Sequence, residues 1–253
     1  MAEAIIQGLV SQKVLPESAV YVCDRNQHKR DRYKSTGVQV VESVNQLTSC
    51  DVIVLAVKPY AAAEALAGLG TDCSSLLVSV CAGVKIEALS AMLVSKSMRV
   101  VRVMPNTPCL VGSGASGYSL GPATSAEDDK LVRMLFESIS LMVPVDESKL
   151  DAITGLSGSG PAYVFMFIES LADAGVQNGL PRDVARKLAA QVVYGSARMC
   201  LENSGLHTAE LRNRVESPGG TTVAGTGALE QAGFRAAVQA AVKAATQRAA
   251  ELG

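Results

Sequence analysis

The residues whose types and spacing best suit chemistry lie near the C-terminal end, in the stretch Ser217-Pro218-Gly219-Gly220-Thr221-Thr222. The proline and the two glycines end any preceding helix, and the two threonines stand where a new helix can begin. Free backbone N–H groups at a helix N-terminus, with Ser and Thr hydroxyls beside them, form a site for a small carboxylate or phosphate. Taken alone, the stretch is more typical of an ordinary Pro-Gly turn with a threonine cap.

A second group of candidate residues follows the expected strand at 19–23. Asp24 stands where an acidic residue holds a ribose 2′-hydroxyl, and Arg25 where an arginine accommodates a 2′-phosphate. The presence of both leaves NAD and NADP open, although the nearby Lys29 and Arg30 favour a phosphate. A solvated polar turn accounts for the same residues equally well.

Two further loops also follow expected strands. Ala56-Val57-Lys58-Pro59 closes the β-branched run 51–57, which is typical of a central strand in a parallel sheet. Asn106 follows the expected strand 99–104 in a loop that its flanking prolines hold rigid, and its amide both donates and accepts hydrogen bonds. Each loop alone is more typical of ordinary loop chemistry, but their recurrence at successive strand ends indicates a ligand crevice.

The elements that position these loops alternate between strand and helix, which predicts a Rossmann-like, doubly wound parallel sheet. The expected helices lie at 2–13, 27–35, 43–49, 61–69 and 86–92, and the expected strands at 19–23, 38–41, 51–57, 76–80 and 99–104. From Leu150 onward only helical periodicity appears, at 163–178, 182–202, 209–215 and 228–252. We therefore expect an α/β domain at 1–146 and an all-helical domain at 147–253, whose many small residues suit a packed bundle or a subunit interface.

Composition excludes several classes of function. The formal net charge of −1 provides no basic field for nucleic acid or an acidic membrane surface. Two histidines and six scattered cysteines make neither a metal site nor a histidine-based triad credible. The scattered thiols, the lack of an apolar run of about 18–20 residues and the lack of a signal peptide predict a soluble, cytoplasmic protein.

Several motifs together resemble the pyrroline-5-carboxylate reductase family. They cover essentially the whole chain and are Val100–Pro108, Gly155–Tyr163 and Ser217–Thr222, with Leu55–Pro59, Ala174–Val176 and Gly179–Arg182. The resemblance implies an NAD(P)H-dependent oxidoreductase that reduces the imine 1-pyrroline-5-carboxylate to L-proline, in proline biosynthesis. It also implies a Rossmann domain followed by a helical domain that forms homodimers, often arranged as decamers.

The resemblance also assigns site residues. Thr222 matches the catalytic threonine whose hydroxyl hydrogen-bonds the ring nitrogen. Because Thr222→Ala would remove a hydrogen bond to a charged group, we expect it to lower kcat/KM by the equivalent of about 1–3 kcal/mol. The remaining implied contacts are with the substrate for Ser217, Gly219, Gly220, Thr221 and Glu147, and with the cofactor for Ala56, Lys58, Pro59, Ala82 and Asn106. The position of Asp24, Arg25 and Val57 at the ends of expected strands predicts that they also contact the cofactor.

One departure from the family pattern affects the expected activity. The family begins with a strand that ends in G-x-G-x-M-[AG], and Met1-Ala2 matches only the last two positions. We therefore expect the first strand and the pyrophosphate loop to be absent and activity to be weak or absent. The alternative function is a shortened, non-catalytic product whose helical domain only oligomerises. Thr226-Gly227 also departs from the family, which usually has a bulky apolar and then a polar residue there.

Overall fold

The computed structural model describes residues 1–252, and these residues form two compact units. One unit comprises Met1–Ser159 together with the residues from Lys243 on, and the other comprises Gly160–Val242. The boundary near residue 146 between an α/β domain and a helical domain stays a prediction.

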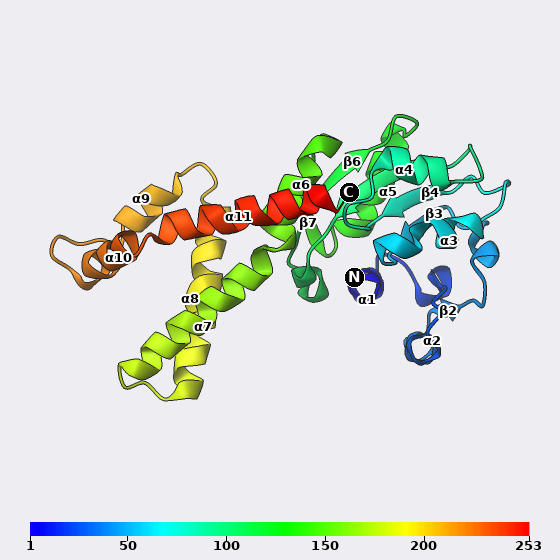
Figure 1. The fold of residues 1–253 in the computed structure, drawn as a ribbon. Coiled ribbons are helices and arrows are strands. Elements are labelled where there is room, and N and C mark those ends of the chain that lie inside the picture. Colours follow the sequence, from blue (N-terminus) through cyan, green and yellow to red (C-terminus); the bar gives the residue numbers. More distant parts are fainter. Residues whose placement is uncertain (253) are drawn as a thin grey trace. The chain divides into compact units, whose positions relative to one another are not determined.

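The first unit contains a five-stranded sheet and a separate two-stranded sheet (Figure 1). In the larger sheet all neighbours are parallel except β6, which is antiparallel to β5. Its order is β3 (Val52–Leu55), β4 (Leu76–Ser79), β5 (Arg99–Met104), β6 (Gly114–Leu120) and β7 (Ser140–Pro144). The smaller sheet pairs β1 (Tyr21–Val22) with β2 (Gln39–Val40) in parallel. The predicted Rossmann-like fold is confirmed, and β6 and β7 are additions that the sequence pattern did not reveal.

Helices flank these strands in the first unit. They are α1 (Ala2–Ser11), α2 (Gln27–Lys34), α3 (Ala62–Ala67), α4 (Ile86–Met92), α5 (Ala126–Phe136) and α6 (Leu150–Ile153). The helix expected at 43–49 is only a short 3₁₀ turn at Val44–Leu47. Within residues 1–252 the first element is α1, and no strand joins β1 to β3, so the two sheets stay separate.

The core explains why helices cover both faces of the larger sheet. On β4, Leu76 and Val78 belong to a buried cluster that also contains residues of α1 and α5. Leu77, which points to the opposite face, belongs to a second cluster with residues of α3 and α4. A strand that is buried on both faces reads as a continuous apolar run, which is the pattern that predicted the parallel sheet.

The second unit is helical throughout its described elements. It contains α7 (Gly160–Gln177), α8 (Arg182–Glu202), α9 (Thr208–Asn213) and α10 (Thr221–Gln231), and α11 (Phe234–Glu251) begins in it. Ala172, Ala185 and Ala189 form the buried contact between α7 and α8. A Cβ added at Gly175 would lie only 3.1 Å from the Cβ of Ala185, so these small residues allow a close helix packing. Of the described helices, none combines the length and apolarity needed to cross a bilayer.

Replacing Asp128 with asparagine is expected to destabilise the first unit in a pH-dependent way. Burial raises the pKa of the Asp128 carboxyl, but hydrogen bonds from Arg99 and Ser125 outweigh that effect and hold the pKa below its ordinary value. The carboxylate therefore stabilises the fold fully above the unfolded-state pKa of about 3.9, and this contribution disappears as the pH falls through the lower folded-state pKa.

Urea titrations at several pH values check this expectation. At pH 7 the free energy of unfolding of Asp128→Asn should be lower than that of the unsubstituted chain by about 1.5–3 kcal/mol, as for a hydrogen-bonded charge. The difference should shrink below about pH 4. A difference that stays constant down to acid pH would show that ionisation of Asp128 contributes nothing.

Candidate active site

The loops that follow β3, β4 and β5 lie at one edge of the sheet. Leu55 pairs with Ser79 and Ser79 with Arg102 in a parallel register, so the three chains leave the sheet on the same side. Along Ala56-Val57-Lys58-Pro59 the side chains are half-buried or exposed, and Ala82 is half-buried. The Cys81 thiol donates to the carbonyl oxygen of Val57 at 3.2 Å and thereby ties the second loop to the first. The structure thus brings these predicted cofactor residues together.

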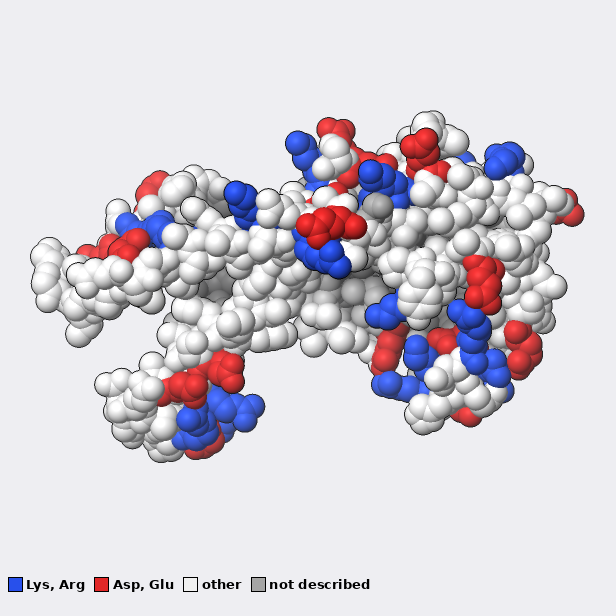
Figure 2. All heavy atoms as spheres, in the orientation of Figure 1, with Lys and Arg blue, Asp and Glu red and all other residues white. Residues whose placement is uncertain are grey.

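Asp24 and Arg25 follow β1, and both are already engaged by protein groups. The Asp24 carboxylate accepts a hydrogen bond from the Asn26 N–H at 2.8 Å and lies 3.6 Å from Lys29 Nζ. The Arg25 guanidinium contacts both carboxylate oxygens of Glu64, each at 2.8 Å. Figure 2 shows the same mixture of Lys, Arg, Asp and Glu over α2. An anion and several cations therefore coexist at this strand end.

Asn106 is buried, with only 7% of its surface exposed, and both ends of its amide bind backbone groups. Its Nδ2 donates to the carbonyl oxygen of Ser157 at 3.0 Å, and its Oδ1 accepts from the N–H of Ala115 at 3.0 Å. The contact with Ser157 links two of the motifs that suggested the family. The sequence predicted neither partner, because Ala115 and Ser157 lie 9 and 51 residues from Asn106 along the chain.

Glu147 takes part in a network around the buried Arg102 on β5. Arg102 is only 4% exposed, and its Nη1 lies 3.3 Å from Glu147 Oε1 while its Nη2 lies 3.8 Å from Asp151. The same Glu147 oxygen accepts from the N–H of Ile86 at 2.7 Å, at the start of α4. Glu147 therefore caps α4, which lacks a side-chain cap of its own, and pairs with a buried cation. Its contact with the substrate stays a prediction.

In the second unit, the stretch Ser217–Gly220 forms a tight turn. The Gly220 N–H donates to the Ser217 carbonyl oxygen at 2.9 Å, and Gly219, the third residue of the turn, has φ +68°. A proline followed by a residue with positive φ is the signature of a type II turn, which glycine alone adopts without strain. The predicted start of a helix is confirmed, because α10 begins at Thr221. No side chain caps this start. The first N–H groups of α10 therefore have no side-chain acceptor.

A hydrogen bond that the sequence did not reveal holds this turn. The Thr226 hydroxyl lies 2.8 Å from Glu216 Oε1 and 3.0 Å from the carbonyl oxygen of Thr222. Arg212 Nε lies 3.4 Å from the other oxygen of Glu216. The threonine that departs from the family pattern thus ties α10 to the residue before Ser217, and the departure was the one signal that pointed to it.

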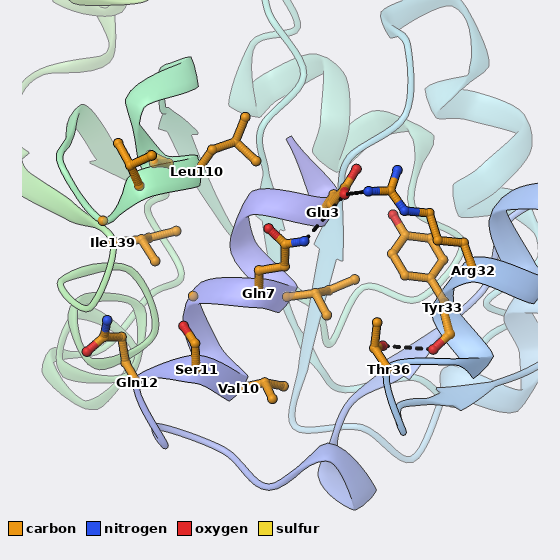
Figure 3. A pocket seen from close by; sticks show the side chains of 15 residues that line it. Glu3, Gln7, Val10, Ser11, Gln12, Arg32, Tyr33, Thr36, Leu110 and Ile139 are labelled. Carbon is orange, nitrogen blue, oxygen red and sulfur yellow. Dashed lines mark hydrogen bonds and ion pairs between the residues drawn. The ribbon is translucent and has the colours of Figure 1, made fainter.

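A cavity of about 420 Å³ lies elsewhere in the first unit, between α1, α2 and the 3₁₀ turn Thr107–Val111 (Figure 3). Glu3 and Arg32 form an ion pair in its wall, beside Gln7 and Tyr33. None of the predicted site residues lines this cavity. Within residues 1–252, no group of three or more His, Cys, Asp or Glu side chains is arranged to hold a metal ion.

The sequence motifs are matched by known proteins along the whole chain. The family profile described as pyrroline-5-carboxylate reductase dimerisation matches residues 147–252, and the profile described as NADP oxidoreductase, coenzyme F420-dependent, matches residues 1–83. A pyrroline-5-carboxylate reductase of Arabidopsis thaliana is 44% identical over 256 residues, covering 100% of this chain and 92% of the relative. The chain belongs to the pyrroline-5-carboxylate reductase family.

Solved structures of pyrroline-5-carboxylate reductases agree with this assignment. The Coxiella burnetii enzyme matches with a TM-score of 0.91 and 34% identity, over 100% of this chain and 94% of that one. The Plasmodium falciparum enzyme, solved with NADP bound, matches with a TM-score of 0.88 and 35% identity, over 99% and 94% of the two chains. The similarity to this family therefore extends over both parts of the chain and not only over its helical part.

Proposed function

We propose that the chain is a pyrroline-5-carboxylate reductase, which reduces 1-pyrroline-5-carboxylate to L-proline with NAD(P)H. The observation that carries the proposal is the uncapped start of α10 directly after the Ser217–Gly220 turn, in a chain whose relatives carry this name. Because the match includes the sheet as well as the helices, it favours the reductase over a product that only oligomerises.

The strand-end loops of the first unit fit a dinucleotide. The backbone of Ala56–Pro59 and Ala82 would lie along the cofactor, with Asn106 near the nicotinamide end and Asp24 and Arg25 near the adenosine ribose. The start of α1 has no side-chain cap, which leaves N–H groups for an anionic group such as a pyrophosphate. The bound cofactor supplies the hydride, and the chain's residues supply orientation and electrostatics.

The turn and helix start in the second unit fit a small cyclic amino acid. Ser217, Gly219 and the N–H groups of Gly220 and Thr221 would hold the carboxylate, since an anion is stabilised at a helix N-terminus. The Thr222 hydroxyl would hydrogen-bond the ring nitrogen and thereby fix the orientation of the imine. A protonated imine is already electrophilic, so the chain chiefly has to hold the two reacting carbons in near-attack geometry, which supplies up to about 7–11 kcal/mol.

The helical part of the chain suits a homodimer, and the description of the profile that matches residues 147–252, which names dimerisation, supports this proposal. Many large apolar side chains of the second unit are exposed, and an apolar surface of this kind marks an interaction site. They include Phe165, Met166, Leu188, Val192, Tyr194 and Leu201. Assembly into decamers, the cytoplasmic location and the absence of nucleic-acid or membrane partners stay predictions.

Thr222→Ala tests the proposed function. In the unsubstituted chain we expect NAD(P)H oxidation that depends on the pyrroline. In the variant we expect kcat/KM to fall by the equivalent of about 1–3 kcal/mol of transition-state stabilisation, because a hydrogen bond to a charged group is lost. Thr208→Ala, at the start of α9, is the matched control and should leave kcat/KM unchanged. Wild-type turnover in folded Thr222→Ala would remove Thr222 from the mechanism, and no turnover in either protein would overturn the function itself.

A further inference from the structure

The motif Gly155–Tyr163 overlaps an irregular helical turn that the family resemblance does not explain. Residues Thr154–Gly158 form a π-helical turn between α6 and α7, and the Ser159 N–H donates to the Thr154 carbonyl oxygen at 2.8 Å across five residues. Turns of this kind are uncommon and occur frequently at functional sites. Such a turn persists only where its surroundings hold it in place.

Pro161 shows why an outside partner is needed here. In a continuous α-helix the carbonyl oxygen of Ser157 would accept the N–H of residue 161, but proline has no N–H to donate. The Asn106 amide supplies the missing donor, with Nδ2 3.0 Å from the Ser157 oxygen. Ser157 is half-buried, and a carbonyl group that is shielded from water without a donor costs free energy, so this contact stabilises the turn.

Asn106 is itself held in place from the other side. Its Oδ1 accepts the N–H of Ala115 on β6, and the residue sits at the end of β5 between two prolines. The packing is also close at the next residue of the turn, because a Cβ added at Gly158 would lie 3.1 Å from Met104 Cε on β5. The buried Asn106 amide and this close packing therefore hold the strand-end loop and the π-helical turn together.

We propose that Asn106 is a positioning residue whose amide replaces the missing N–H of Pro161 and holds the π-helical turn Thr154–Gly158 against the carboxyl end of β5. The proposal deepens the proposed function and rests on it, because the strand end in question is where the cofactor is expected. In this proposal the main role of Asn106 is to hydrogen-bond the protein backbone, and binding of the cofactor is not its main role.

Asn106→Asp distinguishes the role in positioning the π-helical turn from a role in binding the cofactor. The carboxylate keeps an acceptor for the Ala115 N–H but loses the donor to Ser157, so hydrogen exchange at the amides around the π-helical turn should rise about tenfold. In the activity assay, kcat should fall about 10- to 100-fold, as expected when a reacting group is displaced by about 1 Å. The dissociation constant of NADPH, measured by its own fluorescence, should change by less than about twofold, because the amide is not its main contact.

Pro161→Ala provides a rescue that only this mechanism predicts. Alanine restores an N–H at position 161, so the exchange rates and kcat of Asn106→Asp/Pro161→Ala should return at least halfway toward those of Pro161→Ala alone. Asn203→Asp is the matched control, because the Asn203 amide donates to the Met199 carbonyl oxygen at an exposed position. If Asn106→Asp does not fold, Asn106→Ala is used in the same cycle.

Two outcomes would overturn the proposal. One is a roughly tenfold weaker binding of NADPH with unchanged exchange around the π-helical turn, which would make Asn106 a direct cofactor contact. The other is the absence of any rescue by Pro161→Ala. The exchange measurements need neither substrate nor cofactor, so a chain without reductase activity would refute the proposed function and still leave the positioning role testable.

Discussion

Gly220→Ala should lower kcat/KM for the pyrroline about 100-fold, mainly through a higher KM. A Cβ at this position would lie 2.3 Å from Ser217 Oγ and 3.0 Å from the Ser217 carbonyl oxygen. The hydroxyl proposed to hold the substrate carboxylate would have to turn away, and the turn before α10 would have to open. A displacement of about 1 Å in a positioning group is enough for a loss of this size.

Gly225→Ala is the matched control for this prediction. It introduces the same methyl group into α10, but nothing lies within 4 Å of the added atom. We expect unchanged kcat/KM and a gain in the free energy of unfolding of up to about 1 kcal/mol, because alanine favours the helix. Steady-state kinetics with varied pyrroline concentration make the comparison, and an unchanged KM in Gly220→Ala would contradict the carboxylate site.

Arg102→Met should lower the free energy of unfolding by about 2–4 kcal/mol. The substitution keeps an unbranched side chain at the buried position but leaves Glu147 and Asp151 without their cation, and removing one partner of a buried pair costs about 3–5 kcal/mol. Both carboxylates are partly exposed to water, which reduces this cost. Because Glu147 also caps α4, the loss should loosen the loop that carries Ala82.

Urea denaturation of three variants tests this prediction. Arg102→Met/Glu147→Gln should recover part of the loss, because the amide oxygen still accepts the Ile86 N–H while one of the two unpaired charges, that of Glu147, is gone. Arg235→Met breaks an exposed ion pair with Glu230 and should change the stability little. An Arg102→Met protein as stable as the unsubstituted chain would show that the network contributes nothing to folding.

The strand β6 shows where sequence patterns failed. Its residues, Gly-Ala-Ser-Gly-Tyr-Ser-Leu, include no β-branched side chain and one aromatic side chain, so periodicity and propensity give only a weak strand signal. The strand forms because it pairs on both sides, with β5 and β7. Its small residues also let α6 approach closely, since a Cβ at Gly117 would lie 2.8 Å from Ile153. Tertiary packing therefore overrides a weak local preference.

The sequence by itself determined the features that depend on neighbours along the chain. These are the doubly wound alternation up to β5, the helices of the second unit and the turn that starts α10, since periodicity, proline and glycine act over a few residues. Only the tertiary structure decided which distant groups the site residues bind. Asn106 with Ser157 and Glu147 with Arg102 and Ile86 are such contacts, because a buried polar group takes whichever partner the fold brings within reach.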